Sequence, residues 1–398
     1  MSGLFFFIIT HINFLKRNQK NKMKTSKVKL TLVSVLLLGI IGLPSAFAAT
    51  NAELEKRIDA LEKEKTLSDG SRLWDRFSLS GAIELDYSSA DTEDPADKTI
   101  DASTSDLDVG TLELGIEATP HEYVTAFALL KGENLAGDDN VFWDEAYFTL
   151  AKEGLPVYFV GGKRAQPFGL FESLFINDPI TQDLYEVNDT GATIGFTSDT
   201  WMNMDLSFTV YKGETLIARV DEAGYGWTRD TSAGYQETKT VGSYIFNATF
   251  EPVEGLTIAA FLNSEPGDSD RNTTLGGAFH FEHSGFILDF EAMKAVSREK
   301  NTTANEEYEE SAWVASLGYQ VTDPLVLAVR YEDFDADNDD DGNLDNRYSI
   351  GADYLLFENS HFACNLMGEF RRSEYTGDDT SANDLDMNEL FARIAISF

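Results

Sequence analysis

From residue 77 to the end of the chain, apolar and polar residues alternate with a period of two. The first stretch, FSLSGAIELDY, places Phe77, Leu79, Ile83, Leu85 and Tyr87 on one face of a strand, opposite Ser78, Ser80, Glu84 and Asp86. This alternation is typical of β-strands with one apolar face. Sixteen such segments follow one another, beginning near residues 77, 107, 123, 141, 156, 191, 201, 241, 256, 275, 286, 310, 324, 347, 361 and 384.

The connections between the segments differ systematically in length. Those after even-numbered segments are tight, such as KEGLP and EHSG, whereas those after odd-numbered segments are long and polar, such as DFDADNDDDGNLDN. Membrane barrels sort short periplasmic turns from long external loops in this way, and soluble sandwiches have no reason to. The pattern therefore predicts an all-β membrane protein, a 16-stranded antiparallel transmembrane β-barrel. Barrels of about 16 to 18 strands leave an aqueous channel.

Ionisable residues at the alternate positions predict that the barrel interior is wet. An Arg or Lys on the lipid face costs about 2 to 4 kcal/mol at the midplane, with less for acids. The expected lumen-facing residues are Glu84, Asp86, Glu113, Glu117, Asp289, Glu291, Arg330, Asp353 and Arg393. Acids dominate this set, and a lumen of one sign concentrates counterions, so we expect cations to be favoured.

The residues before the barrel predict export. Basic residues precede an apolar run to Leu43, and Ala46-Phe47-Ala48 is a small-x-small cleavage site, so residues 1–48 are expected to comprise an N-terminal extension and a cleaved signal peptide. A membrane anchor is the alternative, but about 14 apolar residues fall short of the roughly 20 needed to cross a bilayer.

A short helix is expected between the signal and the barrel. Leu54, Ile58 and Leu61 form one apolar stripe in residues 49–70, which predicts a periplasmic coiled coil that holds barrels together as a homotrimer. The alternative is a solvated helix without a partner. The 28 residues from Ala49 to Arg76 are too few for a globular plug, so transport is expected to be passive.

The segment QPFGLFESLFINDPITQDLYE, residues 166–186, breaks the alternation. It follows the fifth strand segment, which makes it the third external loop, yet it is rich in large apolar residues that a loop in water does not expose. We expect it to fold inward against the barrel wall as a constriction. Its acids Glu172, Asp178, Asp183 and Glu186 would then line the passage, whereas the alternative is a subunit-contact or lid loop.

Residues 161–196 resemble the LbtU-type siderophore porins. The matching positions are Arg164, Pro167, Phe168, Gly169, Asp178, Pro179, Thr181, Gly195 and Phe196. The resemblance implies passage of a ferric siderophore across the bacterial outer membrane without a plug domain. It also places Arg164, Pro167, Phe168 and Gly169 at the constriction. The terminal Phe398 resembles the last residue of outer-membrane porins, which implies recognition by the barrel-assembly machinery.

Charge and motifs narrow the partners. The formal net charge of −37 makes nucleic acid an unsuitable partner, and the outer-membrane lipid and lipopolysaccharide are the expected surroundings. No cofactor is required, although the partial EF-hand-like pattern at Asp337, Asp339, Asp341, Asn343 and Asp345 allows calcium in an external loop. The alternative there is a solvated acidic loop, because position twelve is Tyr348 instead of Glu.

Three functions follow from the sequence. The first is passive passage of a small solute such as a ferric siderophore, the second is general cation-selective diffusion, and the third is a structural tether to the cell wall. A hydrolase is not expected, because no histidine of the chain after residue 48 has a motif that places a Ser and an acid beside it.

Overall fold

The computed structural model describes residues 76–93, 102–135, 140–227, 240–267, 270–300, 306–338, 343–360, 362–375 and 386–398. The predicted signal peptide, the helix with Leu54, Ile58 and Leu61, and the acids Asp339 and Asp341 lie outside these residues.

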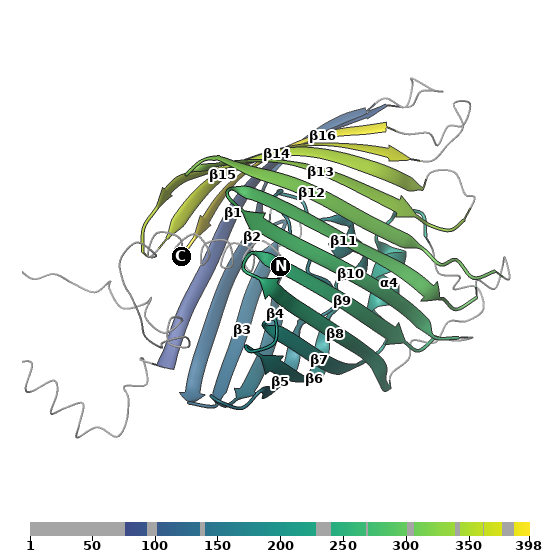
Figure 1. Cartoon of the computed structure of the whole chain (residues 1–398). Coiled ribbons are helices and arrows are strands. Elements are labelled where there is room, and N and C mark those ends of the chain that lie inside the picture. Colours follow the sequence, from purple (N-terminus) through teal and green to yellow (C-terminus); the bar gives the residue numbers. More distant parts are fainter. Residues whose placement is uncertain are drawn as a thin grey trace, which may run out of the picture.

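The described residues form sixteen antiparallel strands closed into one barrel (Figure 1). The strands are β1 (Phe77–Glu93), β2 (Ala102–His121), β3 (Val124–Glu133), β4 (Val141–Ala151), β5 (Val157–Ala165), β6 (Asn188–Ser198), β7 (Met204–Lys212), β8 (Val241–Val253), β9 (Leu256–Glu265), β10 (Asn272–His283), β11 (Phe286–Ser297), β12 (Ser311–Thr322), β13 (Leu325–Asp335), β14 (Leu344–Glu358), β15 (Ala363–Tyr375) and β16 (Asp386–Ser397). Each strand pairs with its sequence neighbours, and β1 pairs with β16. The predicted fold class is confirmed.

The strand starts agree with the predicted ones to within a few residues. The largest difference is at β2, which begins at Ala102 instead of near residue 107. The polar first residues of β2 pair with the last residues of β1, for example Ser103 with Asp91 and Thr104 with Ala90. Backbone pairing thus extends beyond the region in which side chains alternate in polarity.

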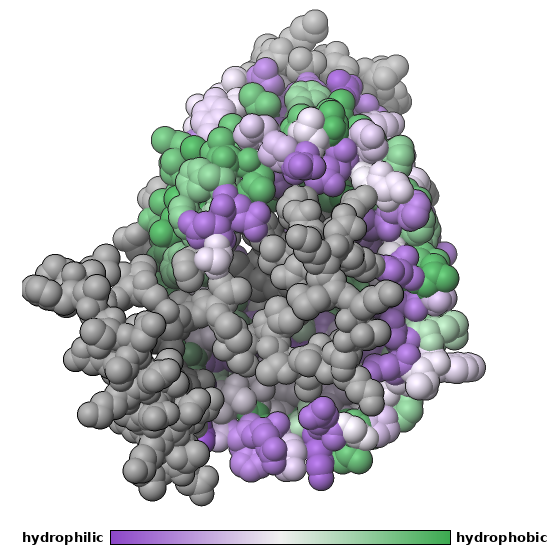
Figure 2. Space-filling model, turned by 60° about the vertical axis from the view of Figure 1, so that its left-hand side comes forward, coloured by the Kyte–Doolittle hydropathy of each residue, from purple (hydrophilic) through white to green (hydrophobic). Residues whose placement is uncertain are grey.

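Side chains alternate between the two faces of the wall as the sequence predicts. On β11, Leu288 is 36% exposed on the outer face, whereas the next residue, Asp289, is 5% exposed on the inner face. On β13, Leu327 and Val329 are exposed and Arg330 is buried. Figure 2 shows hydrophobic residues gathered at the upper left of the face that it presents, with hydrophilic residues interspersed elsewhere.

Two short helices lie in the connections at the end of the barrel that carries the long loops. α3 (Ile180–Tyr185) belongs to the connection between β5 and β6, and α4 (Thr215–Glu222) to the connection between β7 and β8 (Figure 1). Among the described residues, no helix has both the length and the apolar character needed to cross a membrane. The main hydrophobic cluster joins these two helices to inner-wall residues of β7 to β14, such as Tyr211, Phe261 and Met293.

The barrel is closed where the C-terminal residue meets β1. Phe398 and Gly81 exchange backbone hydrogen bonds of 2.9 and 3.0 Å. The Phe398 ring covers Gly81, since a Cβ at Gly81 would lie 2.5 Å from Phe398 Cζ and 2.8 Å from the Glu113 carbonyl oxygen. Because Gly81 has no Cβ, there is room above it for the Phe398 ring.

Gly81→Ala is expected to lower the free energy of unfolding by about 1 to 3 kcal/mol, as overpacking typically does. Urea titration of the refolded barrel, followed by heat-modifiable electrophoretic mobility, measures the change. Gly277→Ala is the matched control, because its Cβ would meet only the Ala259 carbonyl oxygen at an ordinary 3.5 Å. Equal unfolding midpoints for the two variants would show that the closure tolerates the extra methyl group.

Candidate functional site

The third connection turns into the barrel interior and covers its own apolar side. Phe168, Ile180, Leu184 and Tyr185 are wholly buried. The Phe168 ring lies 6.1 Å from the Phe261 ring on β9, and α3 contacts β11, β12 and β13 on the inner wall. These side chains are therefore packed against the opposite inner wall of the barrel instead of facing solvent. For this reason the segment lacks the alternation of a strand.

Three wall carboxylates hold the backbone of this loop. Glu291 on β11 accepts hydrogen bonds from the Leu170 N–H (2.7 Å) and the Thr181 hydroxyl (2.8 Å). Glu332 on β13 accepts one from the Ile180 N–H (2.6 Å). Glu369 on β15 accepts bonds from the Asn177 N–H (2.9 Å) and its side-chain amide (3.0 Å). The loop is therefore attached at points on three separate strands.

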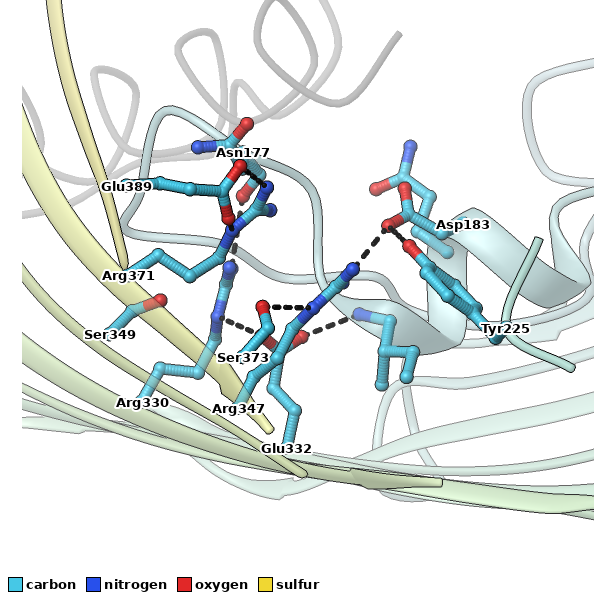
Figure 3. Close-up of polar contacts among 12 residues, drawn as sticks. Asn177, Asp183, Tyr225, Arg330, Glu332, Arg347, Ser349, Arg371, Ser373 and Glu389 are labelled. Atoms are coloured by element: carbon cyan, nitrogen blue, oxygen red, sulfur yellow. Dashed lines mark hydrogen bonds and ion pairs between the residues drawn. The ribbon is translucent and has the colours of Figure 1, made fainter. Parts of the chain in front are cut away.

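Arg330 neutralises two of these carboxylates. Its Nε lies 3.2 Å from Glu332 Oε2, its Nη2 lies 3.5 Å from Glu369 Oε1, and all three side chains have no exposed surface. Nη1 donates to the Asn177 carbonyl oxygen (3.0 Å), and the guanidinium lies 4.6 Å from the centre of the Phe175 ring. Arg330 does point inward from β13, but it lies beneath the loop (Figure 3).

α4 packs beside α3 and depends on another buried carboxylate. Glu265 at the end of β9 accepts hydrogen bonds from the Leu216 and Ile217 N–H groups (2.8 and 3.0 Å), which begin the helix. Free N–H groups at a helix N-terminus favour a negative charge. From α4, Arg219 donates to the Gln182 and Asp183 carbonyl oxygens (3.2 and 2.8 Å) at the end of α3.

A second arginine secures the end of α3 that faces β14. Arg347 Nη1 lies 3.7 Å from Asp183 Oδ2, and the same oxygen accepts a hydrogen bond from the Tyr225 hydroxyl at 2.7 Å (Figure 3). The Arg347 guanidinium also lies 4.6 Å from the centre of the Tyr225 ring. Burial raises the pKa of Asp183, and the nearby Asp178 carboxylate raises it further.

The predicted constriction residues fall into two groups along the loop. Asp178, Asp183 and Glu186 are close enough that Asp178 adds to the burial that raises the pKa of both the others. Glu172 lies apart from them, near His280 and Asp289, where burial raises its pKa to about 7.

The remaining predicted constriction residues begin the loop. Arg164 is the penultimate residue of β5, and its guanidinium lies 5.8 Å from the centre of the Tyr147 ring. Pro167 and Gly169 flank the wholly buried Phe168. Gly169 has a φ of 107°, and a Cβ there would lie 2.2 Å from the Phe171 ring.

The wall from β16 to β3 carries a second set of charges. Arg393 donates to both Asp86 oxygens at 2.7 Å, and its Nη1 lies 3.0 Å from Glu84 Oε2. Lys131 Nζ lies 2.5 Å from Glu133 and 4.0 Å from Glu113. Each of these two cations therefore has two carboxylate neighbours.

The other predicted lumen residues lie elsewhere on the wall. Asp289 pairs with His280 at 2.5 Å, and Asp353 accepts a hydrogen bond from the Asn365 amide at 2.7 Å. Glu117 is half-buried on β2. All three are strand residues, like the rest of the predicted set.

The described part of the predicted calcium loop is held by ordinary hydrogen bonds. Asp337 accepts one from the Glu309 N–H (2.8 Å), and the Asn343 amide donates to Asn338 (2.6 Å). Asp345 accepts one from the Asn346 amide (2.8 Å). No group of three or more His, Cys, Asp or Glu side chains in the described ranges is arranged to hold a metal ion.

Sequence reasoning missed the residues that fix the loop from outside it. Glu265, Glu369 and Arg347 each lie near the end or middle of a strand, where alternation marks them only as inward-facing. α4 had a readable signal, because Leu216, Ile217 and Val220 are spaced as one face of a helix and are all buried.

Comparison with protein families gives a decisive match. Residues 77–396, the whole barrel, match the family model described as phosphate-selective porin O and P. The chain belongs to this porin family. None of the curated proteins compared with the porin matches it significantly.

Solved outer-membrane channels share the fold of this porin at low sequence identity. The outer membrane channel DcaP of Acinetobacter baumannii is 12% identical with a TM-score of 0.57, and covers 81% of this chain and 97% of its own. The anion-selective porin from Comamonas acidovorans is 11% identical with a TM-score of 0.56, covering 81% and 99%. Salmonella typhi OmpF, solved with daunomycin, is 10% identical with a TM-score of 0.56, covering 81% and 97%.

Family membership fixes the general function and location of the porin. It is a channel of the bacterial outer membrane through which solutes diffuse passively. The prediction that the chain is not an enzyme is confirmed by the family, whose members are channels.

Proposed function

We propose that this porin is a cation-preferring diffusion channel whose constriction is formed by residues 166–186. Solutes pass between the exposed side of the loop and the wall from β16 to β3. The loop acids Asp178, Asp183 and Glu186 and the carboxylates Glu84, Asp86 and Glu113 of the wall give this passage its negative potential. Glu172 adds to it from the part of the loop that lies near β10 and β11. Arg164, Pro167, Phe168 and Gly169 set the position of the loop where it leaves β5.

The pairing of three inward arginines with carboxylates supports this proposal. Arg330 faces Glu332 and Glu369, Arg393 faces Glu84 and Asp86, and Arg371 donates to both Glu389 oxygens at 2.7 and 3.0 Å. An arginine already engaged by carboxylates offers an anion little net attraction, whereas a surplus of acids over bases attracts cations. The balance of charge therefore favours cations.

The reversal potential of single channels in a potassium chloride gradient tests the proposed selectivity. We expect a potential of the sign that a potassium preference gives. The family description names phosphate, an anion. A chloride preference, together with block of the current by millimolar phosphate, would contradict the proposal.

Cation preference is expected to fall as the pH is lowered through about 7. Burial raises the pKa of Glu172 to about 7, so this carboxyl changes from charged to neutral in the physiological range. The folded state holds this proton more tightly than the unfolded chain, so the contribution of Glu172 to stability also decreases as the pH rises from 4.5 to 7. Glu172→Gln is neutral at every pH, so it should show throughout the weaker cation preference that the wild type has at low pH. A wild-type reversal potential that is flat between pH 6 and 8 would contradict this assignment.

A ferric siderophore is the narrower substrate that the resemblance of residues 161–196 supports. In this channel the chelate should be neutral or cationic, because the proposed passage repels anions. Growth of a knockout strain on a neutral ferric hydroxamate as sole iron source, with and without complementation, tests it. Equal growth of the knockout and the complemented strain would leave general diffusion as the function.

The homotrimer and the wall-tether alternatives depend on residues 49–70. Deletion of this segment is expected to reduce the native mass to that of one barrel while the conductance per barrel is preserved. Loss of envelope integrity with unchanged mass would instead favour the tether. Mass by light scattering and conductance in planar bilayers are measured on the same preparation.

A further inference from the structure

The outer face of the barrel separates its charges. At the outward positions of β5 to β11 the ionised groups are cations: Lys163 pairs in register with Ala146 and Thr190, Lys212 with Val241, and Lys294 with Leu275. No described Asp or Glu faces outward on these seven strands. Outward acids lie instead on β1, β13, β15 and β16, and include Asp91, Asp333, Asp335, Glu374 and Asp386.

The cations on this side have neutral neighbours. Arg271, just before β10, donates to the Ser264 hydroxyl (2.8 Å) and to the Gly242 and Ser264 carbonyl oxygens (3.0 and 2.9 Å), and lies 4.9 Å from the centre of the Tyr244 ring. The adjacent Asp270 carboxylate accepts the Arg271 backbone N–H (2.7 Å) and is not paired with the guanidinium. Lys163 Nζ donates to the Trp143 carbonyl oxygen at 3.1 Å.

The opposite wall shows the contrast. There Arg372 lies 3.0 Å from Glu374 and 2.6 Å from Asp386, so its charge is compensated. The chain has a net charge of −37, yet Lys163, Lys212 and Arg271 on one stretch of wall have no carboxylate partner among the described residues. Such a group of cations suits a ligand of opposite charge.

An apolar groove of about 570 Å³ lies below the cations on the same strands. Its outward lining comes from β5 to β9, where the small residues Ala248 and Ala260 leave a hollow beside the Phe208 and Phe246 rings, whose centres lie 4.7 Å apart. Phe208 and Lys212 are four residues apart on β7, a separation of about 13 Å along the strand. The cations bracket the groove, because Lys163 lies on β5, Lys212 on β7 and Arg271 beyond the end of β9.

We propose that this face binds one lipopolysaccharide molecule, with the phosphates of its lipid anchor at Lys163, Lys212 and Arg271 and one acyl chain in the groove. The three cations lie at the strand ends that carry the long connections, which is the outer-leaflet side of a membrane barrel. Arginine binds phosphate through paired N–H donors and lysine as a point charge, and both are stronger where carboxylates do not compete. The apolar lining of the groove suits an acyl chain, which a protein partner would not supply.

Native mass spectrometry of the purified full-length porin in detergent tests this site with bisphosphorylated lipid A as the probe. We expect one tightly bound lipid per barrel, and dephosphorylated lipid A should bind at least about tenfold more weakly. The triple variant Lys163→Gln, Lys212→Gln, Arg271→Gln should lose about 100-fold in affinity, at roughly fivefold for each charge near the membrane surface.

Two controls keep the outcome decisive. Arg372→Gln removes an outward cation from the opposite wall and should leave lipid binding unchanged. Ala260→Leu fills the groove without touching a charge and should weaken binding several-fold, which tests the site even if the triple variant fails to fold. Equal binding of the two lipid A forms would overturn the proposal. So would a triple variant that binds lipid normally but loses its oligomeric state, because the face would then be a subunit contact.

Discussion

Replacing Arg330 by alanine is expected to destabilise the porin by about 3 to 5 kcal/mol, the usual cost of removing one partner of a buried ion pair. Glu332 and Glu369 would keep their charges with no exposed surface and no cation beside them. Both carboxylates also hold the loop through Ile180 and Asn177, so we expect the loop to leave the wall. Urea titration and single-channel conductance, which should rise and become noisier, measure the two effects.

Arg372→Ala is the matched control for this prediction. Arg372 also pairs with two carboxylates, but its side chain is 39% exposed on the outer face, where an ion pair contributes about 0 to 1 kcal/mol. A loss of 1 kcal/mol or less in Arg330→Ala would mean that water reaches the cluster. The triple change Arg330→Met, Glu332→Gln, Glu369→Gln should recover part of the stability, because removing a whole buried network costs less than breaking it.

The barrel itself was predictable because each strand repeats one physical choice. Lipid outside and water inside demand that Leu288 and Asp289 face opposite ways, and the same requirement recurs in all sixteen strands. Loop lengths then fix which strand ends lie on which side of the membrane. Neither inference needs long-range contacts, so both follow from the order of residues in this chain.

The site was predictable only in part, because its partners are far apart in the chain. The surplus of apolar residues in 166–186 indicates an inward fold, but nothing local indicates that Glu369 binds Asn177 across 192 residues. Alternation marks Arg330 as inward, yet it does not reveal that the loop covers it. Burial inside a barrel depends on which loops enter the lumen, and that is a property of the closed structure.

Helix α4, which was not predicted from the sequence, adds apolar contacts that hold the third loop in place. The loop packs against α4 on one side and the wall from β11 to β13 on the other, so it is wedged into a hydrophobic cluster in addition to its polar attachments. The carboxylates fix its register along the wall, and the apolar contacts supply most of the free energy that keeps it there. Loss of the carboxylate hydrogen bonds or of the apolar contacts should each release the loop and widen the channel.

Leu184→Asp is expected to release the loop by removing its apolar attachment. Leu184 is wholly buried among Phe168, Ile180 and Leu216, and losing such a side chain alone costs about 2 to 5 kcal/mol, to which an unpaired buried carboxylate adds more. We expect a higher and noisier single-channel conductance at pH 8, with partial return toward the wild-type value at pH 4, where the carboxyl is neutral. Ile176→Asp places the same group on a half-buried position of the same loop and should change the conductance little. Identical currents from the two variants would show that the hydrophobic cluster does not hold the constriction.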